Sequence, residues 1–172
     1  WSHQKLTPLD VKILATDITF SPFTTALNTV TLDSTGDMNN QKQYTISGLQ
    51  GGAEPSLDLS SLNFGPADVS FLATLLTSFS SFSTAVTEVN LSMNKCFDAD
   101  SAKAFSDAVL KSNVQSLVIR NDVKIPIKGT DATCLDFSNQ DFGPGELVLI
   151  SALVIPVSPA VTEVNLSVNP AL

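Results

Sequence analysis

Short triplets, in which one residue separates two apolar residues, dominate the hydrophobic pattern of this chain. Apolar residues that alternate with a period of two are typical of β-strands that bury one face. The triplets recur mostly at intervals of about 28 residues, which is typical of repeat architectures. They predict six short strands, at residues 30–32, 57–59, 89–91, 117–119, 135–137 and 164–166.

Before and between these triplets, apolar residues recur with helical spacing in four segments. Proline fits the first turn of a helix, and a carboxylate there favours the positive end of the helix dipole. The first helix is expected to end at Pro22, and residues 78–84 are expected to form a loop. The expected helices begin at Pro8, at Pro66, at Asp98 or Asp100, and at Pro144. The side chains expected to face inward are Leu9, Ile13, Leu14 and Ile18; Val69, Leu72, Leu75, Leu76 and Phe79; Ala102, Phe105, Ala108 and Val109; and Leu147, Ile150, Leu153 and Val154.

Two segments of the chain occur twice. The segment 85–92 reappears without change at residues 160–167. Upstream of it, residues 57–68 resemble residues 135–146. Matches of this length indicate an internal duplication and not chance similarity.

The duplication divides the chain into two super-repeats, residues 1–94 and residues 95–172. Each is predicted to run helix, strand, extended connection, strand, helix, strand. The extended connections are the short β-like runs at residues 44–48 and 124–129. The chain stops directly after the sixth strand, so we expect an end without a polar cap.

A further apolar residue lies three positions before four of the triplets and completes an L-x-x-L-x-L motif. Because of this motif, the chain resembles leucine-rich-repeat proteins of the long, ribonuclease-inhibitor-like type. The pattern L-x-L-S-x-x-x-F-G-P-A-D at residues 57–68 is similar to repeats of algal and other protist members. The resemblance implies a single α/β solenoid domain, residues 1–172, with one parallel sheet of about six strands on the concave face and helices on the convex face. The four added apolar residues are Leu27, Val86, Val114 and Val161.

The composition excludes several classes of partner. The chain has 172 residues, with 9 Lys and Arg against 17 Asp and Glu, a net charge of −8. A nucleic-acid-binding face or an anionic membrane surface would require the opposite charge. The longest nearly uninterrupted apolar run, residues 147–157, is too short to cross a bilayer, so no membrane insertion is expected.

The residues that most enzymes need are scarce. The single histidine, His3, leaves almost no material for a nucleophile–histidine pair. The two cysteines, Cys96 and Cys134, have neither zinc-site spacing nor a basic neighbour in sequence. Asp98 and Asp100 begin like a calcium loop, but the glycine and glutamate required later in such a loop are missing. We therefore predict no catalysis, no cofactor and no metal site.

The resemblance also implies which side chains reach the concave face, namely those between and beside the triplet residues. Many of them are acidic, so the face is expected to attract a basic protein partner. The same Asn, Asp and Ser side chains could instead satisfy backbone groups of a solvated sheet. The candidate partner-binding residues are Asp33, Asp58, Glu88, Asn90, Arg120, Asp136, Glu163 and Asn165.

Two functions follow as hypotheses. The first is a non-enzymatic protein–protein interaction module or scaffold that presents this acidic face. The alternative is a structural accessory subunit, built through its uncapped ends into a large multi-subunit assembly such as an organellar one. The chain begins with Trp1 and not with Met, which slightly favours a processed chain in an organelle lumen or outside the cell over the cytoplasm.

Overall fold

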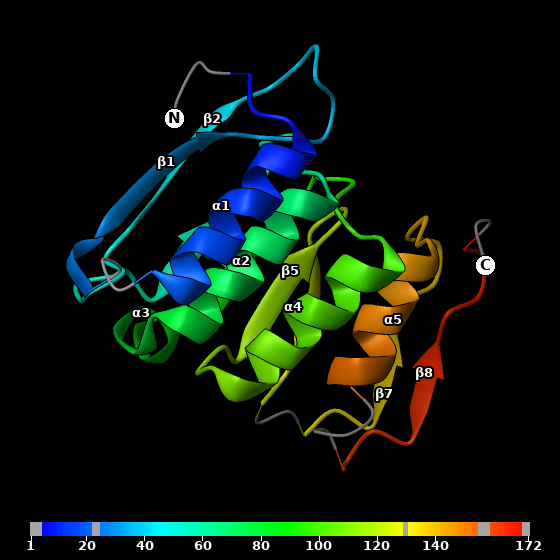
Figure 1. Ribbon diagram of the computed structural model, residues 1–172. Helices are drawn as coiled ribbons and strands as arrows, with labels where there is room; N and C mark the ends of the chain where they lie inside the picture. The colour runs from blue at the N-terminus through cyan, green and yellow to red at the C-terminus, as the bar shows by residue number, and fades with distance from the viewer. Residues whose placement is uncertain (1–4, 22–24, 129–130, 155–158, 170–172) are drawn as a thin grey trace.

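The computed structural model describes residues 5–21, 25–128, 131–154 and 159–169, and within them it contains five helices and eight strands. Helices α1, α2, α4 and α5 pack against one another in this order and form a row. The strands lie along one side of this row of helices (Figure 1). In chain order the elements are α1 (Pro8–Phe20), β1 (Thr29–Asp33), β2 (Gln43–Ser47), β3 (Ser56–Asp58), α2 (Pro66–Ser78), α3 (Ser80–Ala85), β4 (Glu88–Asn90), α4 (Ala99–Lys111), β5 (Ser116–Ile119), β6 (Val123–Pro126), β7 (Cys134–Asp136), α5 (Pro144–Leu153) and β8 (Glu163–Asn165).

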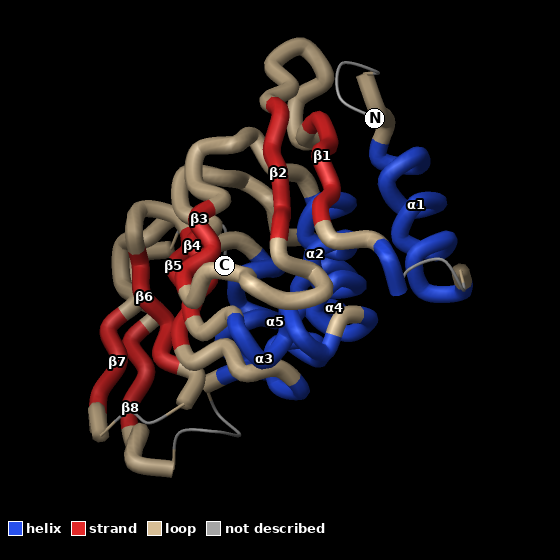
Figure 2. The backbone as a smooth tube through the Cα atoms, turned by 90° about the vertical axis from the view of Figure 1, so that its left-hand side faces the viewer, coloured by secondary structure: helices blue, strands red, loops and turns tan. Residues whose placement is uncertain are grey.

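The strands form three separate sheets. Strands β1 and β2 make an antiparallel pair, and β7 and β8 make a parallel pair. The third sheet has the order β3-β4-β5-β6, with parallel pairing except between β5 and β6. Figure 2 shows the strands following one another along one side of the molecule.

The predicted leucine-rich-repeat solenoid with a single parallel sheet is therefore wrong. The two runs expected to be extended connections turn back as β2 and β6 and pair antiparallel with β1 and β5. A strand edge that is already hydrogen-bonded to a returning strand cannot pair with the next strand of the chain. The sequence signal was present, because Tyr44 and Ile46 alternate with exposed residues and are buried, as are Ile125 and Ile127.

The positions of the six predicted strands are confirmed to within one residue, and so are the four predicted helix starts. The loop expected at residues 78–84 is wrong in part, because α3 occupies most of it. The inward orientation of Leu9 and Ile13 is also wrong. Both are exposed on α1, which has a helical neighbour on one side only. The expected helix end at Pro22 lies outside the described residues.

Carboxylates in the first turn cap the starts of α1, α2 and α5. In α2, Asp68 is buried and accepts hydrogen bonds from Gly65 N (2.8 Å), Thr35 N (2.8 Å), Thr35 Oγ1 (2.7 Å) and Tyr44 OH (3.1 Å). Burial raises the pKa of Asp68, while these hydrogen bonds act in the opposite direction. This one side chain thus joins the β1–β2 sheet to the row of helices.

Two buried asparagines, which follow β4 and β8, connect the backbone segments after neighbouring strands. Asn94 accepts from Phe64 N (3.0 Å) and donates to the carbonyl oxygens of Leu59, Leu91 and Ser92. In the second copy, the hydrogen bonds of Asn169 include one accepted from Phe142 N (3.0 Å). The side-chain amides satisfy backbone groups that such short strands leave without partners.

Replacing Asn94 by alanine should lower the free energy of unfolding by about 3 kcal/mol, because several buried backbone groups would lose their partner. Urea denaturation followed by circular dichroism measures the change. Asn113 is the control, since it is exposed and its side chain donates one hydrogen bond, to Thr84 O. Asn113→Ala should cost about 1 kcal/mol or less. Equal losses in the two variants would contradict the structural role of Asn94.

Candidate functional site

Four of the predicted partner-binding residues terminate strands. The Oδ1 atoms of Asp58, Asn90, Asp136 and Asn165 each accept a hydrogen bond from the backbone N–H two residues further on, at 3.0, 3.0, 2.9 and 3.1 Å. Pairing in register places Asp58 beside Asn90, and Asp136 beside Asn165. Asp and Asn favour this local hydrogen bond. The turns therefore explain why Asp or Asn stands at these four positions, and no binding partner is needed for that explanation. The turn bond also helps to hold the pKa of Asp136 below its usual value.

Glu88 lies in the middle of the four-stranded sheet and is surrounded by donors. Lys124 Nζ on β6 lies 2.7 Å from its Oε2, and Ser116 Oγ on β5 donates to the same atom at 2.9 Å. Ser56 Oγ on β3 lies 3.4 Å from Oε1. The hydrogen bond from Lys124, followed by that from Ser116, lowers the pKa of Glu88. The carboxylate is therefore neutralised within the sheet, which makes this face less acidic than the sequence suggests.

Two predicted residues do not join this face. Asp33 is buried at the end of β1, in the separate β1–β2 sheet. Arg120, the one arginine of the sequence, follows β5, and its side chain is 15% exposed. Its Nε lies 2.9 Å from Oε1 of the buried Glu146 on α5, and Nη1 lies 4.0 Å from Asp141. The Nε–H makes no hydrogen bond within the described residues, so electrostatic attraction carries this contact.

The last of these residues, Glu163, is exposed on β8, where it pairs in register with Cys134 of β7. Exposed carboxylates therefore persist on the strand side at Asp58, Asp136 and Glu163. They belong to two sheets that share no hydrogen-bonded strands. The acidic face is thus smaller and more divided than predicted.

A second surface, which we call the α5–β8 end, is apolar. Helix α5 contributes Leu147, Val148, Ile150 and Ser151, and β8 with the residue after it contributes Val164 and Leu166; together they line an open cavity of about 350 Å³. None of these six side chains is charged. Four of them, Leu147, Ile150, Val164 and Leu166, have the sequence pattern of core residues, so the pattern alone does not mark them as contacts.

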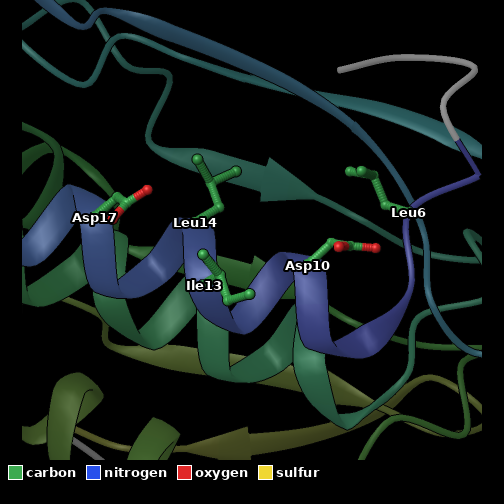
Figure 3. Close-up of a pocket in the computed structure, with 5 residues that line it drawn as sticks. All are labelled: Leu6, Asp10, Ile13, Leu14 and Asp17. Carbon is green, nitrogen blue, oxygen red and sulfur yellow. The ribbon is translucent and has the colours of Figure 1, made fainter.

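At the other end of the row, α1 presents a mixed groove. A cavity of about 220 Å³ is lined by Leu6, Ile13 and Leu14 together with Asp10 and Asp17. Figure 3 shows the two aspartates one on each side of the apolar residues along the helix. Asp10 also caps α1, because its carboxylate accepts from Thr7 N (2.8 Å). The two ends of the helix row thus differ in charge.

The described residues offer little reactive chemistry. Burial raises the pKa of the Cys96 thiol, which therefore stays protonated, and Cys134 is an exposed free thiol. Within residues 5–21, 25–128, 131–154 and 159–169, no group of three or more His, Cys, Asp and Glu could hold a metal ion. In the same part of the chain, no helix has the length and apolar character to cross a membrane.

Comparisons with protein-family models, with curated proteins and with solved structures find no match to this chain. An evolutionary relationship to leucine-rich-repeat proteins therefore stays a prediction that these comparisons do not test. Any function must be argued from the surfaces described above.

Replacing Arg120 by methionine should lower the free energy of unfolding by about 3 kcal/mol, because Glu146 would be left as a buried, unpaired carboxylate. Urea denaturation of the single variants and of Arg120→Met/Glu146→Gln forms a double-mutant cycle. The double variant should recover part of the loss. Strictly additive losses would show that the two side chains do not interact.

Replacing Lys124 by methionine should raise the pKa of Glu88 towards its ordinary value, because the main cause of its depression is removed. Carboxyl NMR titration measures this shift, and Lys128→Met is the control on the same connection. Since folding lowers the pKa of Glu88, its contribution to stability is present above the unfolded pKa and is lost as pH falls through the folded value. That loss should be smaller in the Lys124 variant, in which the hydrogen bond from Ser116 remains, and an unchanged titration would contradict the pairing.

Proposed function

We propose that this chain is a non-catalytic protein-interaction module that is built into an assembly through the α5–β8 end. The observation that carries the proposal is the partial exposure of four half-buried apolar side chains there, around an open and uncharged cavity. Apolar patches exposed on a folded chain usually mark contact sites. This is the function of an accessory subunit, and it needs none of the missing catalytic groups.

The shape and lining of the cavity favour a protein over a small molecule. Small-ligand sites enclose most of their ligand and carry several polar groups that orient it. Here the lining offers a single hydroxyl, from Ser151, and the cavity is open to solvent. A broad apolar contact fits this surface better than the capture of a metabolite.

The strand side supports a second candidate, an electrostatic contact with a basic protein. The helices lie on the opposite side of the strands, which leaves this side uncovered by them (Figure 2). Asp58, Asp136 and Glu163 are exposed there. The two candidates differ in their response to salt, because exposed charges are screened at high ionic strength while apolar burial is not.

Replacing Leu147 by aspartate should abolish association with the natural partner, because a charge would have to be buried in the contact. A tagged chain is isolated from the source cells, washed at low and at high salt, and its bound proteins are identified by mass spectrometry. A complex that resists high salt and is lost in the Leu147 variant is expected. Leu147 is only half-buried, so the variant should keep the fold, which a thermal melt checks.

Leu110→Asp is the matched control, because Leu110 is an exposed leucine on α4, away from the cavity lining. It should retain the partner. The proposal would be overturned if the complex dissociated at high salt and was lost in Glu163→Lys but not in Leu147→Asp. That result would favour an electrostatic contact on the strand side.

A further inference from the structure

The internal duplication lets one half of the chain act as a template for the other. A shift of 78 residues places Pro66 of α2 on Pro144 of α5, and a shift of 75 places Glu88 of β4 on Glu163 of β8. Helix α2 and strand β4 are therefore the counterparts of the two elements that form the α5–β8 end. In the first half both elements are covered, since α2 packs against α4 and β4 pairs with β5.

Equivalent residues are less buried in the second half than in the first. Val89 and Leu91 are fully buried, while their counterparts at the shift of 75 residues, Val164 and Leu166, are only half-buried. On the helices the same holds for Val69, which is fully buried, and its half-buried counterpart Leu147. The half-buried residues at the α5–β8 end thus correspond to fully buried residues of α2 and β4, the two elements that α4 and β5 cover.

The backbone shows the same difference. Leu91 N donates to Val118 O (2.7 Å) and Met93 N donates to Arg120 O (2.6 Å), which extends the pairing of β4 with β5. The counterparts of these two donors are Leu166 N and Val168 N. Neither has an acceptor among the described residues. Strand β8 therefore offers an open parallel edge, and such an edge is a template for an added strand.

From these observations we propose that the partner covers the α5–β8 end with a helix followed by a strand, in the manner of α4 and β5. The strand pairs parallel with β8, and the helix packs against α5. This inference rests on the proposed function and specifies its partner. The surface carries no charge, so the contacting side of the helix is uncharged, as in α4, where the buried residues include Ala102, Phe105 and Ala108.

A second copy of this chain fits the surface poorly. Helix α1 is the counterpart of α4, since each precedes an antiparallel pair of strands, β1–β2 and β5–β6, and both have 13 residues. At the third position α1 has Asp10 where α4 has the buried Ser101, and seven residues later it has Asp17 where α4 has the buried Ala108. Docking α1 on the α5–β8 end would bury two carboxylates without a cationic partner, which is costly. The occupant is therefore not the α1 face of a second copy.

The test uses a synthetic peptide with the sequence of residues 95–121, which contains α4 and β5, added to the isotopically labelled full chain. Hydrogen exchange by NMR should slow about tenfold or more at Leu166 N and Val168 N when the peptide binds. The amides of Leu91 and Met93, which already have acceptors, should not change. A peptide with Phe105→Asp and Leu117→Asp is the control and should not bind, because both side chains are fully buried where α4 and β5 cover α2 and β4.

The outcomes separate this inference from the proposed function. A lack of binding by the peptide, while the natural complex still depends on Leu147, would overturn the helix–strand partner and leave the function intact. A natural complex indifferent to Leu147→Asp would overturn both. Protection of the Leu166 and Val168 amides without peptide, with a dimer in sedimentation, would assign the surface to a second copy and overturn the proposed helix–strand partner.

Discussion

The structure depends on the need of short strands for hydrogen-bond partners beyond the ladder itself. Strands β3, β4, β7 and β8 have three residues each, so ladder bonds alone leave many backbone groups near the core without partners. Asn94 and Asn169 supply partners inside, and the Asx turns at the strand ends supply them outside. The asparagine and aspartate residues of the duplicated motif are therefore part of the scaffold, which limits how many of them a partner can use.

The pairing of strand edges explains why the strands divide into three sheets. Each half of the chain sends one strand back antiparallel, β2 onto β1 and β6 onto β5, and these pairings occupy edges that a continuous parallel sheet would need. Asp68, buried beneath β1 and β2, then ties the first pair to α2 through Thr35 and Tyr44. In the second half, Arg120 and Glu146 connect the end of β5 with the start of α5 by an ion pair instead. Both halves thus join strand to helix through a buried carboxylate.

Local structure was predictable from the sequence where a single element determines it. Period-two triplets located six strands, and proline with an acidic residue located the helix starts, because these signals act within one turn or one strand. Pairing partners were not predictable, since the choice between an antiparallel return and a parallel neighbour depends on which edge is already occupied. Arg120 was misplaced for a related reason. Its left-handed backbone, with φ of 50°, turns the side chain from the strand face towards α5, and nothing in the sequence around it signals this.

The candidate site was missed because core and contact residues have the same pattern. Leu147 and Val164 look like core residues in sequence, and their counterparts Val69 and Val89 are core residues. Only the arrangement of the elements shows that nothing among the described residues covers the second pair. The α1 groove has the opposite character, because Asp10 and Asp17 border its apolar lining. Since one end of the helix row is charged and the other is neutral and apolar, the two ends are not complementary.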